Sequence, residues 1–368
     1  MKKILILANS SIGLYKFRLE LIQELLKLNF IVYFSLPDNV DDIYVKKLEG
    51  IGAIYIQTKF IRNKVNIFSD LLLFFKYILL IKKIKPNVIL TYTIKPNIYG
   101  SFAAKFYNTP TIINITGLGN SFNNKLLSKV VIYLYKYACN NAKFVFFQNN
   151  FNKDFFINNN IVKKAIIKQI PGSGVNLNRY KFIEKEKRKD TVNFVFIGRI
   201  MKEKGIEEYL QVAQKITSIY QNTTFYILGE FNNPKYSLVI NSIRNERIRY
   251  VGFIDNIYNF MKDKNIDCII HPSYYYEGMS NVLLEAAAMG IPIIASNIPG
   301  CKEVVEDKKN GFLIAPKDID DLYKKVEIFV NLDISIKNEM GIYGRKIVEK
   351  YFDRSLVINV YLDCVCNL

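Results

Sequence analysis

Short apolar runs alternate with longer amphipathic segments along the whole chain, and this alternation restricts the folds it can adopt. In the first half, the apolar runs predict strands at residues 3–8, 31–36, 53–57, 88–92, 111–115, 144–148 and 166–170. Segments with helical periodicity lie between them, at residues 15–28, 42–50, 68–84, 97–107, 125–140 and 150–158. Strands that alternate with helices are typical of a parallel sheet covered on both faces.

The alternation starts again after a cluster of glycines and polar residues at 171–176 and a charged run at 184–190. Strands are then predicted at residues 192–197, 224–228, 248–253, 267–271, 292–296 and 311–314. Helices are predicted at residues 205–219, 236–245, 257–262, 281–289, 320–330, 334–350 and 354–365. A chain of 368 residues is long enough for two hydrophobic cores. We therefore predict two α/β, Rossmann-like doubly wound domains, at residues 1–172 and 173–350, and a closing helical segment at 351–368.

Composition excludes a disordered chain and indicates an anionic partner. Half of the residues are hydrophobic, and the net charge is +18. Residues 1–175 carry 24 Lys and Arg against 8 Asp and Glu, whereas residues 176–368 carry 27 against 25. A general bias toward lysine would affect both halves. The basic first half therefore suggests a membrane surface, a nucleic acid or a phosphorylated substrate.

Cysteine usage and hydropathy give no sign of a secreted or membrane-spanning chain. Five scattered cysteines lack zinc-site spacing, which favours reduced cytosolic thiols: Cys139, Cys268, Cys301, Cys364 and Cys366. The first residues resemble a signal peptide, but polar residues follow where a cleavage site should be, so a first strand is favoured. The most apolar segment, residues 71–81, contains Lys76 and is too short to span a bilayer.

Ligands of parallel α/β sheets bind at the carboxyl ends of the strands, and three turns of the first half lie there. Residues 9–13, which include Gly13, precede a helix and could cradle phosphate or acceptor, although they lack the Gly-x-Gly-x-x-Gly pattern. Residues 93–97 and 116–119 follow the fourth and fifth strands. Arg18 is expected in the first turn of the first helix, where a cation opposes the dipole. This indicates either an anionic ligand or simple solvation.

In the second half, Arg199 follows a strand, and Lys204 and Gly205 precede a helix. Two cations beside a helix N-terminus suit a diphosphate. The alternative is a surface turn with two solvated bases.

The stretch 272–296 reads as a loop, a helix and a buried strand. Glu277 lies before the expected helix, Glu285 lies inside it, and Gly278 and Ser280 allow a tight turn with a polar cap. Carboxylates at this place can hold several sugar hydroxyls. The plainer interpretation is a capping acid at Glu277 and a solvated acid at position 285.

Weaker signals flank these residues. Gly229 and the pair Phe253 and Ile254 follow strands and would approach a nucleotide base. His271, the one histidine, stands at a strand end, where a structural role is favoured. Asp318 and Asp320 read better as a helix cap than as metal ligands, and we expect no metal site.

Two segments of the first half are both apolar and rich in lysine, residues 68–85 and 125–143. Each is expected to cover the sheet as a core helix. A membrane-surface helix is the alternative for both.

Taken together, three motifs of the second half resemble the retaining family 4 (group 1) glycosyltransferases of GT-B fold. They are Phe-Ile-Gly-Arg199 with Lys204-Gly, Glu277-Gly-Met-Ser-Asn-Val-Leu-Leu-Glu285-Ala, and Gly290-Ile-Pro-Ile-Ile-Ala-Ser. In the first half, Tyr15-Lys-Phe-Arg18, Lys95-Pro-Asn97 and Thr116-Gly-Leu-Gly119 resemble bacterial members that build surface polysaccharides or lipid-linked glycans, including those that extend undecaprenyl-diphosphate-linked sugars.

The resemblance implies two domains facing across a cleft, with a C-terminal helix crossing back to the first. Arg199 and Lys204 would bind the donor diphosphate, Glu277 the donor sugar and Glu285 the ribose. Further expected donor contacts are Gly13, Gly229, Phe253, Ile254, Gly278, Met279, Ser280 and Asn281. Expected acceptor contacts are Arg18, Lys95, Asn97, Thr116 and Gly117. The histidine that many members carry in the first domain is missing, and residues 114–119 occupy the comparable region.

The implied reaction moves a hexosyl or N-acetylhexosaminyl group, with retention, from a nucleotide sugar (a UDP-sugar) to a glycan acceptor linked to undecaprenyl diphosphate. It would use no metal or other cofactor, and no nucleic acid. The enzyme would act in the cytoplasm, at the inner face of an anionic membrane. An inverting GT-B transferase is the nearest alternative. A nucleotide-cofactor oxidoreductase lacks its glycine fingerprint here, and a non-catalytic membrane-binding module leaves the polar motifs of the second half unexplained.

Overall fold

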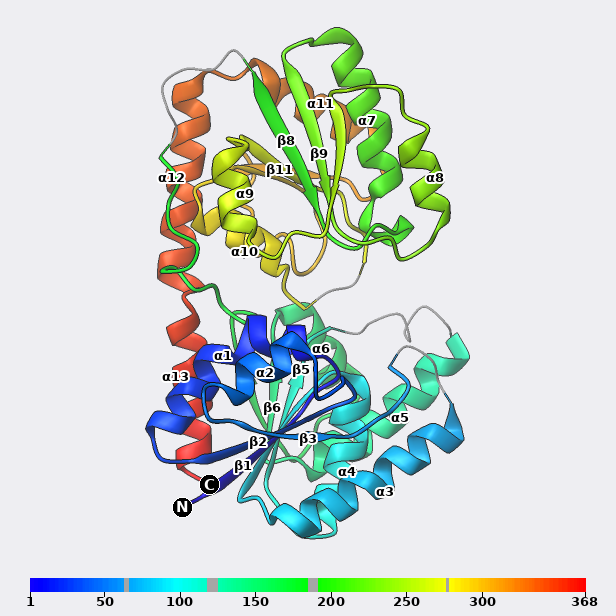
Figure 1. Ribbon diagram of the computed structural model, residues 1–368, viewed down its shortest axis with the longest axis vertical. Coiled ribbons are helices and arrows are strands. Elements are labelled where there is room, and N and C mark those ends of the chain that lie inside the picture. The colour runs from blue at the N-terminus through cyan, green and yellow to red at the C-terminus, as the bar shows by residue number, and fades with distance from the viewer. Residues whose placement is uncertain (63–65, 118–124, 185–190, 276–277) are drawn as a thin grey trace. The chain divides into compact units, whose positions relative to one another are not determined.

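The computed structural model describes residues 1–62, 66–117, 125–184, 191–275 and 278–368, and the chain divides into two compact units. The first unit contains Met1–Ser173 and Ser355–Leu368, and the second contains Gly174–Arg354 (Figure 1). The expected divisions at residues 172 and 350 lie close to these points. The last residues of the chain return to the first unit.

The first unit is built on a parallel sheet of seven strands in the order β3-β2-β1-β4-β5-β6-β7. Its strands are β1 (Lys3–Leu7), β2 (Ile31–Leu36), β3 (Ile54–Gln57), β4 (Val88–Tyr92), β5 (Thr111–Ile115), β6 (Phe144–Phe147) and β7 (Ile166–Gln169). Its helices are α1 (Ser11–Lys27), α2 (Ile43–Glu49), α3 (Ile67–Ile84), α4 (Ser101–Lys105), α5 (Lys125–Asn141), α6 (Asn150–Asn158) and α13 (Arg354–Cys366). The central strands are buried because helices cover both faces of the sheet (Figure 1).

The second unit is built on a parallel sheet of six strands in the order β10-β9-β8-β11-β12-β13. Its strands are β8 (Val192–Ile197), β9 (Thr223–Leu228), β10 (Ile248–Gly252), β11 (Cys268–His271), β12 (Ile293–Ser296) and β13 (Gly311–Ile314). Its helices are α7 (Ile206–Ile219), α8 (Lys235–Asn241), α9 (Ile257–Asp263), α10 (Asn281–Ala288), α11 (Ile319–Asn331) and α12 (Ile334–Tyr351). Two parallel Rossmann-like sheets confirm the predicted fold class.

Three helices differ from their predicted bounds by more than one residue at an end. α1 begins at Ser11 because the side chain of Ser10 caps it, accepting from the Gly13 N–H at 3.4 Å. The helix expected at 97–107 is a π-turn at Pro96–Gly100 followed by the short α4, and a Cβ on Gly100 would lie 2.7 Å from Leu7 Cδ1. α8 stops at Asn241, short of the predicted residue 245.

No helix among the described residues has the length and apolar character needed to cross a membrane.

The helix α13 completes the core of the first unit. Tyr361 is buried, and its ring lies 4.8 Å from that of Phe146 and 6.3 Å from that of Tyr92. Its hydroxyl accepts a hydrogen bond from Asn114 Nδ2 at 2.5 Å. The C-terminal helix is therefore part of this core.

This packing yields a stability prediction. Tyr361→Ala should lower the free energy of unfolding by about 3–5 kcal/mol, because a buried ring leaves a cavity when it is removed. Tyr351→Ala, at a position 52% exposed on α12, is the matched control and should change it by about 0.5 kcal/mol or less. Urea unfolding would measure both. Equal small losses would contradict a core role for α13.

Candidate active site

In the second sheet, the turns that follow the neighbouring strands β8 and β9 approach each other closely at two glycines. Gly198 follows β8 and Gly229 follows β9, with φ of 156° and 142°. A Cβ built on Gly229 would overlap the carbonyl oxygen of Gly198, so only glycine permits this approach. The turn carrying Arg199 is therefore held against the end of β9.

A second close approach joins the turn after β8 to the loop after β11. The 3₁₀ turn Lys202–Lys204 ends at Gly205, whose φ is 77°, and a Cβ there would overlap the carbonyl of Pro272. The Glu203 carbonyl accepts from the Tyr274 N–H at 2.9 Å and from Ser273 Oγ at 3.3 Å. The two loops thus form one surface at the carboxyl edge of the sheet.

The structure brings the two predicted cations to one aromatic ring. The guanidinium carbon of Arg199 lies 5.7 Å from the Tyr275 ring centroid, and Lys204 Nζ lies 5.5 Å from it. Arg199 is exposed, whereas Lys204 is buried. The alternative of two solvated bases is therefore wrong for Lys204.

Burial sets the electrostatics of this turn. It lowers the pKa of Lys204 to about 8; Cys301 opposes the shift and Arg199 adds to it. Burial, and then Lys204, lower the pKa of His271 to about 3, so the imidazole is neutral. Neither ring nitrogen of His271 has a hydrogen-bond partner among the described residues. An anion placed here would relieve the repulsion between the two cations.

Glu285 lies inside α10 and is buried. Burial, and then the nearby charge of Glu285, raise the pKa of the Tyr180 hydroxyl. Arg345 on α12 donates to the carbonyls of Tyr180 at 3.0 Å and Ala288 at 2.8 Å, and so holds the Tyr180 segment against α10. The interpretation of residue 285 as a solvated acid is therefore wrong.

The start of α10 differs from the expectation in one respect. Ser280 is the N-cap residue, but its side chain makes no capping hydrogen bond, and its N–H donates to the Gly300 carbonyl at 2.9 Å. Gly278 and Met279 are buried beside it, and Asn281 is the first residue of the helix. Glu277 lies outside the described residues.

The remaining predicted donor contacts of the second unit follow the neighbouring strands. The Gly229 carbonyl accepts from the Tyr250 hydroxyl at 3.1 Å, and its N–H donates to the Gly252 carbonyl at 2.9 Å. Phe253 is exposed just after β10, and Ile254 packs partly buried on the core. In the order β10-β9-β8-β11, these residues and the two cations occupy one continuous edge. No group of metal-ligating side chains is found in the part of the chain that the structure describes.

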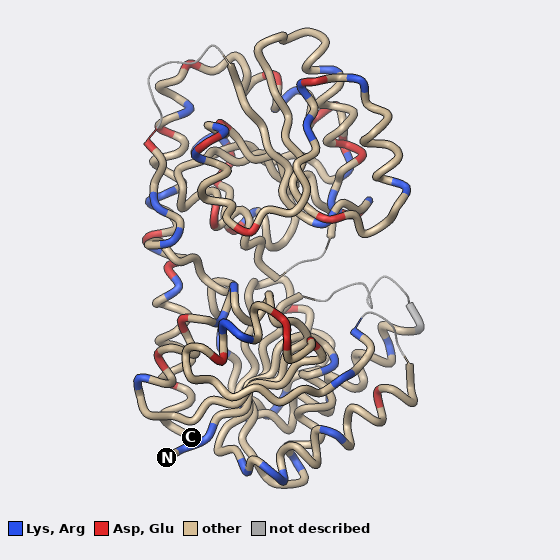
Figure 2. Tube along the Cα trace, in the orientation of Figure 1, with Lys and Arg blue, Asp and Glu red and all other residues tan. Residues whose placement is uncertain are grey.

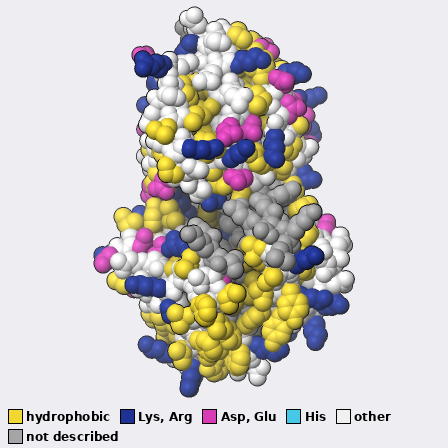
Figure 3. Space-filling model, turned by 90° about the vertical axis from the view of Figure 1, so that its right-hand side faces the viewer, with side chains coloured by type: hydrophobic (Ala, Val, Ile, Leu, Met, Phe, Trp, Pro, Cys, Tyr) yellow, Lys and Arg dark blue, Asp and Glu magenta, His cyan; other side chains and the backbone are white. Residues whose placement is uncertain are grey.

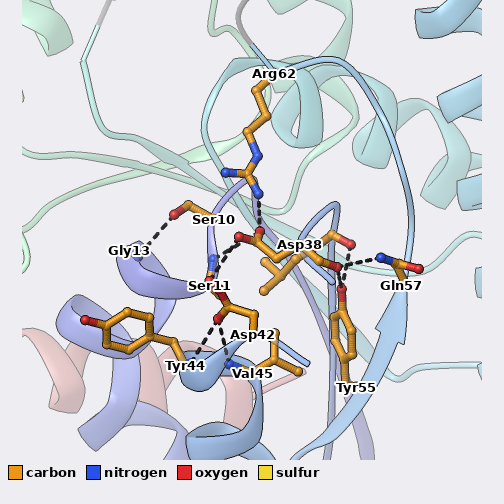
Figure 4. Close-up of polar contacts among 11 residues, drawn as sticks. Ser10, Ser11, Gly13, Asp38, Asp42, Tyr44, Val45, Tyr55, Gln57 and Arg62 are labelled. Carbon is orange, nitrogen blue, oxygen red and sulfur yellow. Dashed lines mark hydrogen bonds and ion pairs between the residues drawn. The ribbon is translucent and has the colours of Figure 1, made fainter. Parts of the chain in front are cut away.

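In the first unit, sequence reasoning missed Asp38, which organises the corresponding edge (Figure 4). Its carboxylate accepts from the Ser11 N–H at 3.3 Å and Ser11 Oγ at 3.0 Å, and it pairs with Arg62. Its carbonyl accepts from the hydroxyl of Tyr55 and from Gln57 Nε2. Burial and Asp38 raise the pKa of Tyr55 to about 12. The signal was available, since Asp38 follows β2 with only Pro37 between them.

Gly13 lies at this edge, in the first turn of α1. Its N–H is engaged by the Ser10 cap, as described above. The predicted contact of Gly13 with a donor stays a prediction.

The position of Arg18 corrects one sequence argument. Because α1 begins at Ser11, Arg18 lies about two turns inside the helix, beyond the reach of the N-terminal dipole. Arg18 is buried, with its guanidinium 4.7 Å from the Tyr92 ring and 5.8 Å from the Tyr361 ring. Its Nη1 donates to the Phe17 carbonyl at 2.7 Å. The cation is held by aromatic faces, so the dipole conflict does not exist.

Lys95 and Asn97 also lie inside the fold. Lys95 Nζ is 2.5 Å from Asp70 Oδ1 in a largely buried pair and donates to the Ile61 carbonyl at 2.8 Å. Asn97 is fully buried and donates to the Asn114 carbonyl at 2.9 Å. Both side chains therefore hold loops in place at the carboxyl edge of the first sheet.

The predicted acceptor residues after β5 lie at the carboxyl edge of the first sheet. Thr116 and Gly117 follow β5 and are half-buried, and Gly117 has a φ of 140°. Gly119 lies outside the described residues.

Two family models match the chain. One, described as glycosyl transferases group 1, matches residues 178–347, and the other, glycosyl transferase 4-like, matches residues 3–149. Together they span most of both units. The chain belongs to the group 1 glycosyltransferases.

Curated relatives agree with this assignment. The chain is 26% identical over 310 residues to the Staphylococcus aureus capsular polysaccharide biosynthesis glycosyltransferase CapM, covering 80% of each chain. It is 26% identical over 341 residues to the Campylobacter jejuni N,N'-diacetylbacillosaminyl-diphospho-undecaprenol alpha-1,3-N-acetylgalactosaminyltransferase, covering 88% of each. The enzyme is therefore a glycosyltransferase of the kind that moves hexosyl or N-acetylhexosaminyl groups.

Solved structures place this glycosyltransferase in the GT-B fold. The structure of Anabaena HepE in complex with UDP superposes with a TM-score of 0.79 at 18% identity, covering 100% of both chains. At this identity the likeness shows the fold alone, and it confirms the predicted GT-B architecture.

The glycine contact yields a prediction with a matched control. Gly198→Ala and Gly229→Ala both force alanine into positive φ, but a Cβ on Gly198 meets nothing within 4 Å. Gly198→Ala should cost about 1 kcal/mol of unfolding free energy. Gly229→Ala should cost about 1–3 kcal/mol more, because the backbone must move. Chemical denaturation would compare them, and equal losses would contradict the close approach.

Proposed function

We propose that the enzyme transfers a sugar from a UDP-sugar, with retention, to a glycan acceptor linked to undecaprenyl diphosphate. The observation that carries this proposal is the pairing of exposed Arg199 and buried Lys204 around Tyr275 at the edge of the second sheet. Two cations fixed by backbone contacts suit the diphosphate of a nucleotide donor.

The proposed chemistry follows from where charge develops. Breaking the sugar–phosphate bond leaves negative charge on the diphosphate, and Arg199 and Lys204 stabilise it there without needing a metal ion. In a front-face displacement, a departing phosphate oxygen takes the acceptor proton and the new bond forms on the same face. No protein base is required. This fits a first unit without histidine and a neutral, buried His271.

Glu285 is proposed to hold the ribose hydroxyls, and Glu277 the donor sugar. Support for Glu285 comes from its burial and from its electrostatic interaction with Tyr180, whose segment Arg345 holds against α10. The UDP in the HepE structure and the alpha linkage in the name of the Campylobacter relative support a uridine donor and retention.

The acceptor is proposed to meet the first unit at a membrane surface. The undecaprenol in the Campylobacter relative's name supports a lipid-linked acceptor. The positive excess of residues 1–175 supports attraction to anionic lipid at the inner face of the cytoplasmic membrane.

Product stereochemistry tests the proposal. Incubation with UDP-sugars and an undecaprenyl-diphosphate-linked glycan should give an α-linked product from an α-donor, seen by NMR. Glu277→Ala should lower kcat by about 100-fold while UDP affinity and thermal stability change little. A β-linked product would overturn retention. A Glu277→Ala variant that unfolds would return this residue to a capping role.

The pKa of Lys204 predicts how donor affinity depends on pH. Diphosphate favours the charged amine, so its pKa rises from about 8 in the free protein when UDP binds. Below pH 8 the amine is charged in both states, and affinity is constant. Above pH 8 the free protein must take up a proton to bind, so affinity should fall by about tenfold per pH unit.

Calorimetry between pH 7 and pH 9.5 would measure this decline. Lys204→Met should bind more weakly and remove this decline. Lys202→Met, at an exposed lysine of the same turn, should behave like the parent protein. A parent affinity that is unchanged from pH 7 to pH 9.5 would refute the role of Lys204.

A further inference from the structure

The exposed face of α3 is apolar along most of its length. Phe68 is 87% exposed, Leu72 55% and Leu79 65%, and the same face carries Ile67, Leu71 and Phe75. These positions follow helical spacing, so they form one stripe. A soluble surface helix normally carries polar residues on this side, and contiguous exposed apolar surface marks an interaction site.

The opposite face of α3 packs into the core of the first unit. Leu73, Tyr77, Leu80 and Ile81 are buried against the sheet. The core interpretation of this segment is therefore correct for one face of the helix, and the exposed stripe is additional. Its six large side chains are half or more exposed.

Aromatic contacts extend the stripe over α4 toward α5. Phe74 of α3 lies 5.8 Å from Phe106, and Phe102 of α4 lies 4.8 Å from Tyr137 of α5. Phe106, Tyr133 and Tyr137 are exposed. Figure 3 shows hydrophobic side chains gathered over the first unit. We call the stripe of α3 with Phe106, Tyr133 and Tyr137 the apolar platform.

Lysine positions recur along α3, α4 and α5, the helices that carry the apolar platform (Figure 2). Among the side chains that the structure describes on these three helices, the exposed lysines are Lys82, Lys83, Lys105, Lys129 and Lys136. Asp70 is the one acidic residue in the sequences of α3, α4 and α5, and it is buried in its pair with Lys95. An apolar surface rimmed by lysines matches the layer where acyl chains meet anionic headgroups.

We propose that the apolar platform inserts into an anionic lipid bilayer and docks the first unit on the membrane. This rests on the proposed lipid-linked acceptor and names the surface that would meet its membrane. A second copy of this chain fits the surface poorly. A symmetric contact between two platforms would bring lysine rims of like charge together.

The chain contains no tryptophan, so a single introduced indole reports on one place. Phe68→Trp should shift its emission to shorter wavelength with vesicles of phosphatidylglycerol and phosphatidylcholine, and brominated lipids should quench it. Leu238→Trp, at a position 75% exposed on α8 of the second unit, is the matched control and should not respond. Equal responses would overturn the proposal, as would no response at Phe68.

Removal of the stripe gives the complementary test. The triple variant Phe68→Ser, Leu72→Ser, Leu79→Ser should lower vesicle binding by about 100-fold, because it removes three inserting side chains. Leu238→Ser should bind like the parent. Turnover of a membrane-embedded acceptor should fall with binding, whereas turnover of a short-chain, water-soluble acceptor should stay unchanged.

These readouts separate the two proposals. Loss of vesicle binding in the triple variant supports the platform, whether or not the parent protein glycosylates an acceptor. Failure of the parent protein to glycosylate any acceptor would count against the proposed function alone. Unchanged vesicle binding in the triple variant overturns the platform, whatever the activity. A parent protein that dimerises and ignores vesicles, with a monomeric triple variant, would assign the surface to a second copy and overturn lipid insertion.

Discussion

The second unit depends on how closely the backbone turns at one sheet edge approach one another. Gly229 meets the Gly198 carbonyl, and Gly205 meets that of Pro272. Each contact excludes a Cβ, so the turns are held by main chain rather than by flexible side chains. The backbone of Arg199 and Lys204 is held in place in this way, because both residues lie on the turn between these two contacts. Preorganised cations stabilise developing charge without moving at the moment of reaction.

The first unit fixes its own edge by a different means, a buried polar network. Asn114 is buried in strand β5 and links three partners: Tyr361 of α13, Gln148 after β6, and Asn97 through its carbonyl. Buried polar groups are costly unless hydrogen-bonded, so each partner constrains the others. The helix that returns from the end of the chain therefore locks the loops after β4, β5 and β6.

The strands, and the edge at which the polar residues gather, were predictable from the sequence because both follow from local periodicity and from the geometry of parallel sheets. The roles of Lys95 and Asn97 were not. The acidic partner of Lys95 lies 25 residues away, and Asn114 bonds Tyr361 across 247 residues. Local patterns do not contain such pairs. Arg18 was misplaced for a local reason, since Ser10 was read as loop rather than as a helix cap.

The unequal charge of the two halves becomes intelligible once burial is considered. In the first half, Lys95 forms a largely buried ion pair with Asp70, and Arg18 is covered by aromatic rings. Lysines of α3, α4 and α5 are instead exposed to solvent. The excess therefore acts at the surface, where screening is strong and many charges are needed. Lys204 itself is buried, and a single buried charge interacts strongly. The proposed diphosphate site can thus work in the half with almost no net charge, because burial strengthens the interaction of Lys204 with an anion.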